Sequence, residues 1–324
     1  MSDKILVLGN CTEWCDIVYH DLNDESVTFN NTNFIERMNF FTRAFYKLKT
    51  SRRIRMFHNS KMISYVLSSF FKKKCQQFSK IIIFDWNPLC FDDWFLYFFK
   101  KRGIEIGIIF TNLYIKSGLH TFKKDYLLDK FYDEIFYFDK NDLKRPELKK
   151  IPYSFSTKFV LSLCGQGDII YDVFFIGNAK DRFSIVLRIY EKMVASGLKC
   201  LFIVNGIDTN EQIENGMIYN KYISYKEVLG FSSKSRCILE ILQNGGSTST
   251  LRIMEAISLN KYFLTNNYSI SDDSIFDTNH MFVISEKYDF SRFKETIIEK
   301  FNYSNFYKQQ ISIDNLKKTL MEGK

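Results

Sequence analysis

Residues 171–204 read YDVFFIGNAKDRFSIVLRIYEKMVASGLKCLFIV, and their pattern decides the fold class of the chain. The apolar run 171–176 predicts a buried strand, and residues 182–195 repeat apolar side chains at helical spacing before Gly197. A second apolar run, 199–204, predicts another strand. A strand, a helix and a strand in this order are typical of the parallel sheet of an α/β protein.

The same alternation occupies both halves of the chain. Further strands are predicted at 4–9, 80–84, 104–110, 134–138, 236–241 and 262–265, with helices at 33–48, 91–102, 225–232 and 250–259. Between 139 and 167 the pattern breaks, and this segment contains Pro146, Pro152 and a run of charged residues. We therefore predict a first domain at 1–160 and a second at 161–300, followed by a C-terminal helix at 301–324.

The composition allows a folded, soluble chain with a sizeable core. Of the 324 residues, 46% are hydrophobic and 25% charged, and there is no apolar run long enough to span a membrane. The N-terminus does not resemble a signal peptide, so a cytoplasmic location with reduced cysteines is expected. Four scattered histidines predict no metal site, and a net charge of +8 favours anionic partners such as phosphorylated substrates, anionic lipid or nucleic acid.

A run of short hydroxyl side chains precedes the helix predicted at 250–259. The stretch 247–256 reads STSTLRIMEA and follows two glycines at the end of the predicted strand 236–241. The amides and dipole of a helix N-terminus favour an anion, and Arg252 adds a fork of N–H donors suited to phosphate. Glu255 lies one turn further on, where a carboxylate can accept hydrogen bonds from a ribose. The alternative is an ordinary N-cap followed by a surface ion pair.

A second turn of this kind follows the strand at 171–176. It reads GNAKDR and places Lys180 and Arg182 at the start of a helix, where cations oppose the helix dipole. This conflict indicates an anion between them, although both cations can also simply be solvated. Neither a P-loop nor a G-x-G-x-x-G motif is present, which argues against an ATPase or a dinucleotide-binding enzyme.

Taken together, these segments resemble bacterial glycosyltransferases of the GT-B fold, the group that builds capsule and lipopolysaccharide chains. The resemblance covers four segments in the same order, at 132–156, 171–204, 222–245 and 247–267. It implies two Rossmann-like domains whose parallel sheets face a central cleft, with the acceptor bound by the first domain and a UDP- or GDP-linked sugar by the second. It also implies that the C-terminal helix returns to the first domain.

The resemblance assigns a role to each residue of the donor site. It places Lys180, Arg182, Ser247, Thr248, Ser249, Thr250 and Arg252 at the diphosphate, Glu255 at the ribose, and Ile223, Ser224 and Tyr225 at the base. It implies neither a metal nor a cofactor, because helix ends and cations offset the charge of the leaving diphosphate. Many retaining members carry a second glutamate eight positions upstream, where this chain has Ser247. Retention and inversion of the sugar linkage therefore both stay open.

The catalytic base of an inverting enzyme should follow a strand of the first domain. Glu13 lies in the segment after the strand at 4–9, and Asp85 follows the strand at 80–84. Trp86 comes next and could stack on a sugar, although Asp often begins turns and Trp is more often a core residue.

The expected partners are a nucleotide-sugar and a glycan or lipid-linked acceptor at the inner surface of the cell membrane. Residues 45–57 and 69–78 combine cations with aromatic side chains, as membrane-surface segments do. Solvated basic faces over core aromatics would have the same composition. Two rival hypotheses are a nucleic-acid-binding protein, which no RNP, KH or zinc motif supports, and a catalytically silent GT-B subunit.

Overall fold

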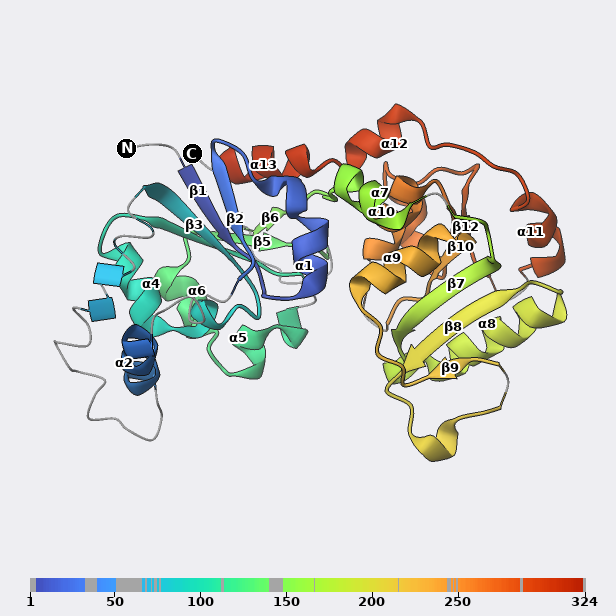
Figure 1. Cartoon of the computed structure of the whole chain (residues 1–324), viewed down its shortest axis with the longest axis horizontal. Helices are drawn as coiled ribbons and strands as arrows, with labels where there is room; N and C mark the ends of the chain where they lie inside the picture. Colours follow the sequence, from blue (N-terminus) through green and yellow to red (C-terminus); the bar gives the residue numbers. More distant parts are fainter. Residues whose placement is uncertain are drawn as a thin grey trace. The chain divides into compact units, whose positions relative to one another are not determined.

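The computed structural model of the chain describes residues 4–32, 40–50, 66–67, 69–70, 72, 75, 77–111, 114–139, 148–165, 167–214, 216–243, 246, 248, 250–285 and 288–322 (Figure 1). The chain forms two compact units. The first comprises Met1–Phe138, Asp142–Ile151 and Leu316–Lys324, and the second comprises Asp139–Asn141 and Pro152–Asn315. The second unit thus begins before the predicted boundary at 161, and the chain's last residues belong to the first unit.

The first unit is built on a six-stranded sheet in which every neighbouring pair is parallel. Its strands are β1 (Lys4–Leu8), β2 (Val27–Asn30), β3 (Phe78–Phe84), β4 (Glu105–Ile109), β5 (Glu134–Tyr137) and β6 (Leu148–Lys150). They are ordered β2-β1-β3-β4-β5-β6. The α-helices in the described part of this unit are α1 (Glu13–Val18), α2 (Phe40–Thr50), α4 (Asp93–Lys100), α5 (Gly118–Thr121) and α6 (Tyr126–Phe131).

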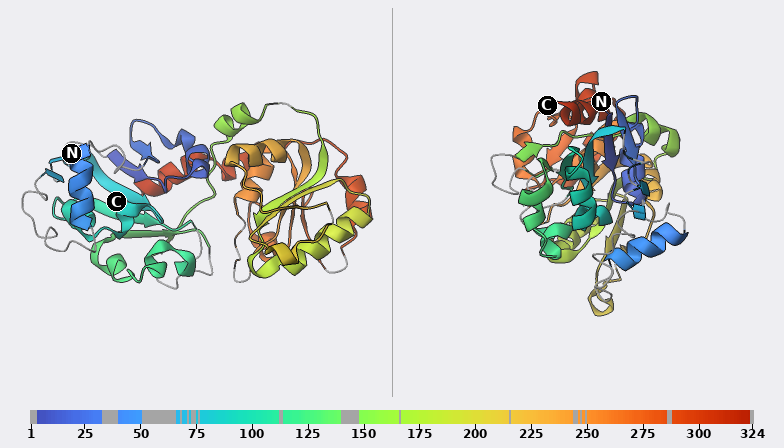
Figure 2. Two further views of the ribbon diagram at one scale, coloured as in Figure 1. Left: turned by 60° about the horizontal axis from the view of Figure 1, so that its bottom comes forward. Right: turned by 90° about the vertical axis from the view of Figure 1, so that its left-hand side faces the viewer.

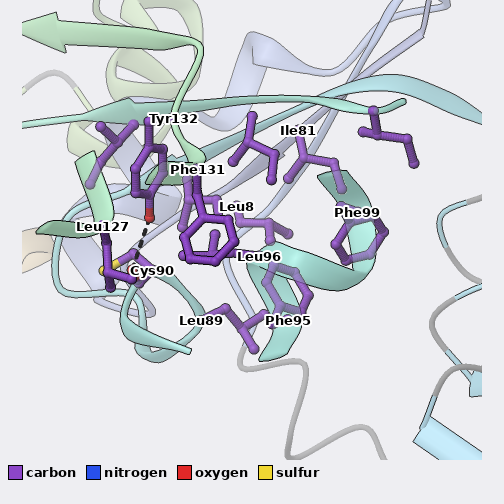
Figure 3. Close-up of a cluster of buried hydrophobic side chains, with 14 of the residues drawn as sticks. Leu8, Ile81, Leu89, Cys90, Phe95, Leu96, Phe99, Leu127, Phe131 and Tyr132 are labelled. Carbon is purple, nitrogen blue, oxygen red and sulfur yellow. Dashed lines mark hydrogen bonds between the residues drawn. The ribbon is translucent and has the colours of Figure 1, made fainter. Parts of the chain in front are cut away.

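Alternate residues of the first sheet enter a core with α4 and α6. Leu8, Ile81 and Ile106 contribute side chains from three neighbouring strands, and Phe95 and Phe99 contribute two from α4. Figure 3 shows this cluster, in which the hydroxyl of Tyr132 donates to the carbonyl of Cys90 at 2.9 Å. Because parallel strands are apolar on both faces, these strands were readily predicted from sequence.

The second unit contains another six-stranded parallel sheet. Its strands are β7 (Tyr171–Asn178), β8 (Cys200–Asn205), β9 (Ile218–Tyr219), β10 (Ser235–Glu240), β11 (Tyr262–Thr265) and β12 (Met281–Val283). Their order, β12-β11-β10-β7-β8-β9, is that of a Rossmann sheet. The α-helices are α7 (Thr157–Cys164), α8 (Phe183–Ala195), α9 (Tyr225–Ser233), α10 (Leu251–Leu259), α11 (Phe290–Thr296) and α12 (Asn305–Gln310), with α13 (Ile313–Met321) extending into the first unit.

Helices cover both faces of the second sheet, as Figure 2 shows for α8 on one side. Val186 and Met193 of α8 share a core with Phe293 of α11, whereas Val228 of α9 packs on the opposite face with Phe174. The helix α10 ends at Asn260, whose φ of 52° is left-handed. Asparagine adopts this conformation more readily than most residues and often follows the last turn of a helix.

The end of α13 is bound to the first sheet through a buried lysine. Lys80 is 1% exposed, and its Nζ lies 2.6 Å from Glu134 Oε2 and 3.2 Å from the carbonyl of Leu320. A cation at the C-terminal end of a helix satisfies its last carbonyls and complements the dipole. Lys317 of the same helix pairs with Asp24 at 3.2 Å.

Four edge strands were not predicted, namely β2 and β6 of the first sheet and β9 and β12 of the second. The strand β6 consists of Leu-Lys-Lys and lies in the segment where the predicted pattern breaks, and β2 is only four residues long. Edge strands of two to four residues are too short to show a strand pattern, and β6 is in addition polar. The helix predicted at 33–48 corresponds to α2, and residues 33–39 and 51–65 lie outside the described residues.

Candidate functional site

The two strands at the centre of the second sheet, β7 and β10, are neighbours whose connections leave in opposite directions. The strand β7 continues through α8 to β8 on one side, and β10 continues through α10 to β11 on the other. Such a topological switch point is where open α/β sheets bind ligands, beyond the carboxyl ends of the strands. The turn 177–182 lies here, and of the turn 247–250 the structure describes Thr248 and Thr250, which lie between β10 and α10.

Arg182 ties the ends of these two strands together. Its Nε and Nη2 donate to the carbonyl of Asn178 at 3.2 and 3.1 Å, and its Nη1 donates to the carbonyl of Ile241. A Cβ on Gly177 would lie 2.8 Å from Nη2, so a larger residue there would require the guanidinium to shift. Burial lowers the pKa of Arg182, against the raising effect of Asp181 and Glu240. Arg182 thus lies at the switch point, and some of its guanidinium N–H groups donate to the backbone carbonyls of Asn178 and Ile241.

Lys180 begins the short 3-10 helix at Lys180–Arg182, and the structure describes its backbone only. Ser247 and Ser249 lie outside the described residues. The diphosphate contacts predicted for these three side chains therefore stay predictions.

The hydroxyl-rich turn is held by two carboxylates that sequence reasoning did not identify. The amide of Thr250 donates to Glu240 Oε1 at 2.6 Å, and Glu240 Oε2 accepts from the hydroxyl of Thr265 at 2.8 Å. The amide of Thr248 donates to Asp139 Oδ2 at 3.1 Å. Both carboxylates are buried. Two amides expected to meet the diphosphate thus have protein acceptors in this structure.

A signal for Glu240 was present in the sequence. It is a charged residue at the end of the buried strand SRCILE, and a carboxylate in that position needs hydrogen-bond donors. No comparable signal existed for Asp139, which is 109 residues from its partner Thr248.

Thr250 itself is the N-cap of α10. Its backbone is extended, and its hydroxyl oxygen accepts from the amide of Arg252 at 3.4 Å. The capping alternative is therefore correct for this hydroxyl. The Arg–Glu pair that follows is also present, but it is not the surface ion pair that the alternative supposed.

Three of the predicted donor residues form one hydrogen-bonded cluster. Glu255 has no exposed surface, and its Oε1 accepts from the hydroxyl of Tyr225 at 2.9 Å. Its Oε2 accepts from Arg252 Nη1 at 2.5 Å and from Ser232 Oγ at 3.4 Å. Burial raises the pKa of Tyr225 well above its usual value, and the Glu255 carboxylate adds to the effect. Arg252, with 18% of its side chain exposed, lies between Glu255 and solvent.

The two other residues predicted at the base have structural contacts at the start of α9. Ile223 is buried in the core with Phe174 and Val228. Ser224 forms a capping box with Glu227, whose Oε2 accepts from the serine amide at 2.7 Å and from its hydroxyl at 2.8 Å.

The candidate bases lie at the switch point of the first sheet, between β1 and β3. Asp85 has no exposed surface, and its Oδ1 accepts from the amide and hydroxyl of Thr111 at 3.0 and 2.8 Å. It thus anchors the turn after β3 to the end of β4, and a substrate hydroxyl could reach it only if this turn moved. Glu13 is exposed in the first turn of α1.

Among the described residues, no group of three or more His, Cys, Asp or Glu side chains could hold a metal ion. Within the same residues, no helix has both the length and the apolar character needed to cross a bilayer.

No protein-family model matches the sequence, and no match was found among curated proteins. Solved structures do match over nearly the whole chain. An α-glucosyltransferase in complex with UDP and a 13-mer DNA containing an HMU base aligns with a TM-score of 0.58 and 11% identity over 99% of this chain and 95% of that one. The α-glucosyltransferase in complex with UDP-glucose and DNA containing an abasic site gives a TM-score of 0.54 and 12% identity, over 98% and 94%.

An α,α-trehalose-phosphate synthase from Burkholderia xenovorans, in complex with glucose-6-phosphate, aligns with a TM-score of 0.50 and 9% identity over 97% of this chain and 96% of that one. At such identities the likeness establishes the fold. The chain has the α/β architecture of GT-B glycosyltransferases, as the sequence predicted, and each unit contains a six-stranded parallel sheet.

Proposed function

We propose that this chain is a glycosyltransferase that moves a sugar from a nucleoside-diphosphate donor to a glycan or lipid-linked acceptor. The observation that carries the proposal is the convergence of Arg182, the start of α10 and the Tyr225–Arg252–Glu255 cluster on the second sheet's carboxyl side. This side of a Rossmann sheet binds nucleotides in many unrelated enzymes. The α-glucosyltransferases that share the fold bind UDP and UDP-glucose, which supports a donor of the same chemical class.

The proposed chemistry is electrostatic. A departing nucleoside diphosphate develops negative charge, which Arg182, Arg252 and the N-terminus of α10 would offset without a metal ion. The diphosphate would have to share this region with Glu240 and Asp139, which hold the turn between β10 and α10. Glu255 would act on the ribose through Arg252 and Tyr225, because its own carboxylate is buried beneath them.

The acceptor would bind to the first unit. Glu13 is the better candidate for the base, because it is exposed at the start of α1, whereas Asp85 is buried and bonded to Thr111. A base in this position would remove the proton of the acceptor hydroxyl as the sugar carbon is attacked.

The acceptor would be a growing cell-surface polysaccharide at the cytoplasmic face of the membrane. The helix α2 supports this location, because it exposes 80% of Phe40 and 72% of Phe41 and carries Arg43 and Lys47. Exposed aromatic and basic residues on one helix suit an anionic lipid surface.

Flotation with phosphatidylglycerol vesicles tests this membrane location. The double variant Phe40→Ser with Phe41→Ser should no longer float with the vesicles, and retention of flotation would exclude this helix as the anchor.

Nucleotide binding and turnover test the central proposal. Thermal shifts should rise with UDP, GDP or another nucleoside diphosphate, since a ligand that binds only the folded state stabilises it. Arg252→Ala should reduce the shift, whereas Arg188→Ala, which removes an exposed arginine of α8, should not. Release of the nucleoside diphosphate from the cognate sugar donor, with and without EDTA, then tests transfer and metal independence. If no nucleoside diphosphate stabilises the chain, the proposal is wrong.

A nucleic-acid partner is a second candidate, because two of the α-glucosyltransferase structures that share the fold contain DNA. Binding of a duplex DNA that weakens steeply with salt, without any nucleotide-dependent thermal shift, would favour a nucleic-acid-binding protein over an enzyme. Nucleotide binding without turnover on any acceptor would favour a silent GT-B subunit.

A further inference from the structure

A bulky aromatic residue occupies a left-handed backbone position at the switch point of the first sheet. Trp86 has φ = 69°, and the amide of Asn87 donates to the carbonyl of Phe84 at 3.1 Å, which closes a tight turn after β3. The third residue of such a turn is ordinarily glycine or asparagine, because a Cβ there is strained. A large residue keeps this conformation only where its surroundings impose it, and such positions cluster at binding sites.

Both flanks of Trp86 are fixed by buried polar side chains. Before it, the Asp85 carboxylate accepts from Thr111, and the Asp85 amide donates to the carbonyl of Ile109 at 2.8 Å. After it, the Asn87 side chain donates to the carbonyl of Gly9 at 2.5 Å and accepts from the Leu89 amide. The turn therefore joins the ends of β1, β3 and β4.

This rigid turn directs an indole ring to the surface. Trp86 is 41% exposed, and its ring meets that of Phe122 at 6.1 Å with an interplanar angle of 72°. Phe122, itself 49% exposed, packs edge-on against Phe91 at 5.2 Å. Gly118 leaves room for this arrangement, because a Cβ there would lie 2.3 Å from the Phe91 ring. We call Trp86 and Phe122 the aromatic corner.

We propose that the aromatic corner is a saccharide-binding subsite, in which the C–H face of one pyranose ring of the acceptor lies on Trp86 against Phe122. Sugar rings present apolar C–H faces that pack on aromatic rings, while their hydroxyls remain solvated. The two exposed rings, at an interplanar angle of 72°, form a corner into which one face of a sugar ring can pack. The aromatic corner lies at the switch point of the first sheet, after the carboxyl end of β3, and the exposed Glu13 follows the carboxyl end of the neighbouring strand β1. Open α/β sheets bind ligands at such a position.

This inference rests on the proposed function for the identity of the acceptor, but it is testable without turnover. Saturation-transfer NMR would use methyl α- and β-pyranosides of glucose, galactose, mannose and N-acetylglucosamine as probes. At least one glycoside should receive saturation at its ring C–H protons from the wild-type chain. Trp86→Gly, which suits the left-handed turn and removes the ring, should weaken its binding by about tenfold or more, as should Phe122→Ala. Trp86→Phe keeps an aromatic face and should largely retain it.

Two results would overturn the assignment. Either no glycoside of the panel receives saturation from the wild-type chain, or Trp86→Gly and Phe122→Ala bind the glycoside as well as the wild type does. If dodecylphosphocholine receives saturation that depends on Trp86, and no glycoside does, the aromatic corner is a lipid-binding site and not a saccharide-binding site. A UDP thermal shift on the same samples separates the two proposals. Nucleotide binding without glycoside binding refutes the aromatic corner alone, whereas glycoside binding without nucleotide binding refutes the donor site.

Discussion

The backbone amide of Thr250 donates a 2.6 Å hydrogen bond to the buried carboxylate of Glu240. This bond fixes the start of α10 to the end of β10, and the second oxygen of the same carboxylate accepts from Thr265 of β11. One side chain therefore connects two strands with the turn that we propose to face the donor diphosphate.

Two replacements of Glu240 should distinguish what its hydrogen bonds contribute to stability from what its negative charge does to nucleotide binding. Glu240→Ala leaves a buried amide and hydroxyl without their acceptor and should lower the free energy of unfolding by about 1–3 kcal/mol, measured by urea denaturation. Glu240→Gln keeps an oxygen for Thr250 and should cost less. Because the glutamine has no charge to repel a diphosphate, it should also bind the nucleotide at least as tightly as the wild type. Equal stability of the two variants would show that the hydrogen bonds contribute nothing.

The Arg252–Glu255 pair should be strongly coupled. Arg252→Ala leaves the Glu255 carboxylate buried with only the Tyr225 and Ser232 hydroxyls, and removal of one member of a buried pair typically costs about 3–5 kcal/mol. Arg252→Ala with Glu255→Gln should recover part of that loss. A double-mutant cycle by urea denaturation measures the coupling. Strict additivity of the two changes would mean that the pair does not interact.

At position 86, glycine should give a more stable protein than alanine, the reverse of their usual order in stability. Both Trp86→Gly and Trp86→Ala remove the ring, but only alanine keeps a Cβ at φ = 69°. We expect the glycine variant to be more stable than the alanine variant by about 1 kcal/mol. Thermal unfolding of the matched pair tests this, and a more stable alanine variant would show that the left-handed turn is absent in solution.

Lys261 should make stability depend on pH in the alkaline range. Burial lowers its pKa to about 8, and nearby Arg236 acts in the same direction. Because the folded pKa lies below the unfolded value, the chain loses stability as the pH falls from the unfolded pKa of about 10.4 towards the folded pKa, and the penalty is complete below it. Lys261→Met should remove this slope, and the free energy of unfolding at neutral pH should rise by about 1–2 kcal/mol. Identical pH profiles for the variant and the wild type between pH 8 and the unfolded pKa would contradict the lowered pKa.

Much of the fold was predictable because parallel strands are apolar throughout. The strand at 262–265 was predicted with the bounds that the structure gives, and α8 and α10 begin within one residue of their predicted starts. The edge strand Leu148–Lys150 was not, because a short polar edge pairs through its backbone alone.

The candidate site was predictable in its elements but not in its contacts. The turn after β10 and the Arg252–Glu255 spacing could be read along the chain. The bond between Thr248 and Asp139, and the burial of Glu255 beneath Tyr225, join residues that are far apart in sequence. Likewise, nothing in the sequence around Arg182 showed that it would bond the carbonyl of Ile241. Such pairings depend on the register and topology of the folded sheet, which periodicity does not encode.

The amide resonances of Thr248 and Thr250 offer the most direct test of the donor site. In a chain labelled with 15N only at threonine, Thr248→Ser and Thr250→Ser identify the two signals while keeping the hydroxyl groups. On titration with the nucleoside diphosphate that stabilises the chain, we predict that both signals move and saturate together with the thermal shift. If the nucleotide binds while both signals stay in place, the diphosphate lies elsewhere and the proposed site is wrong.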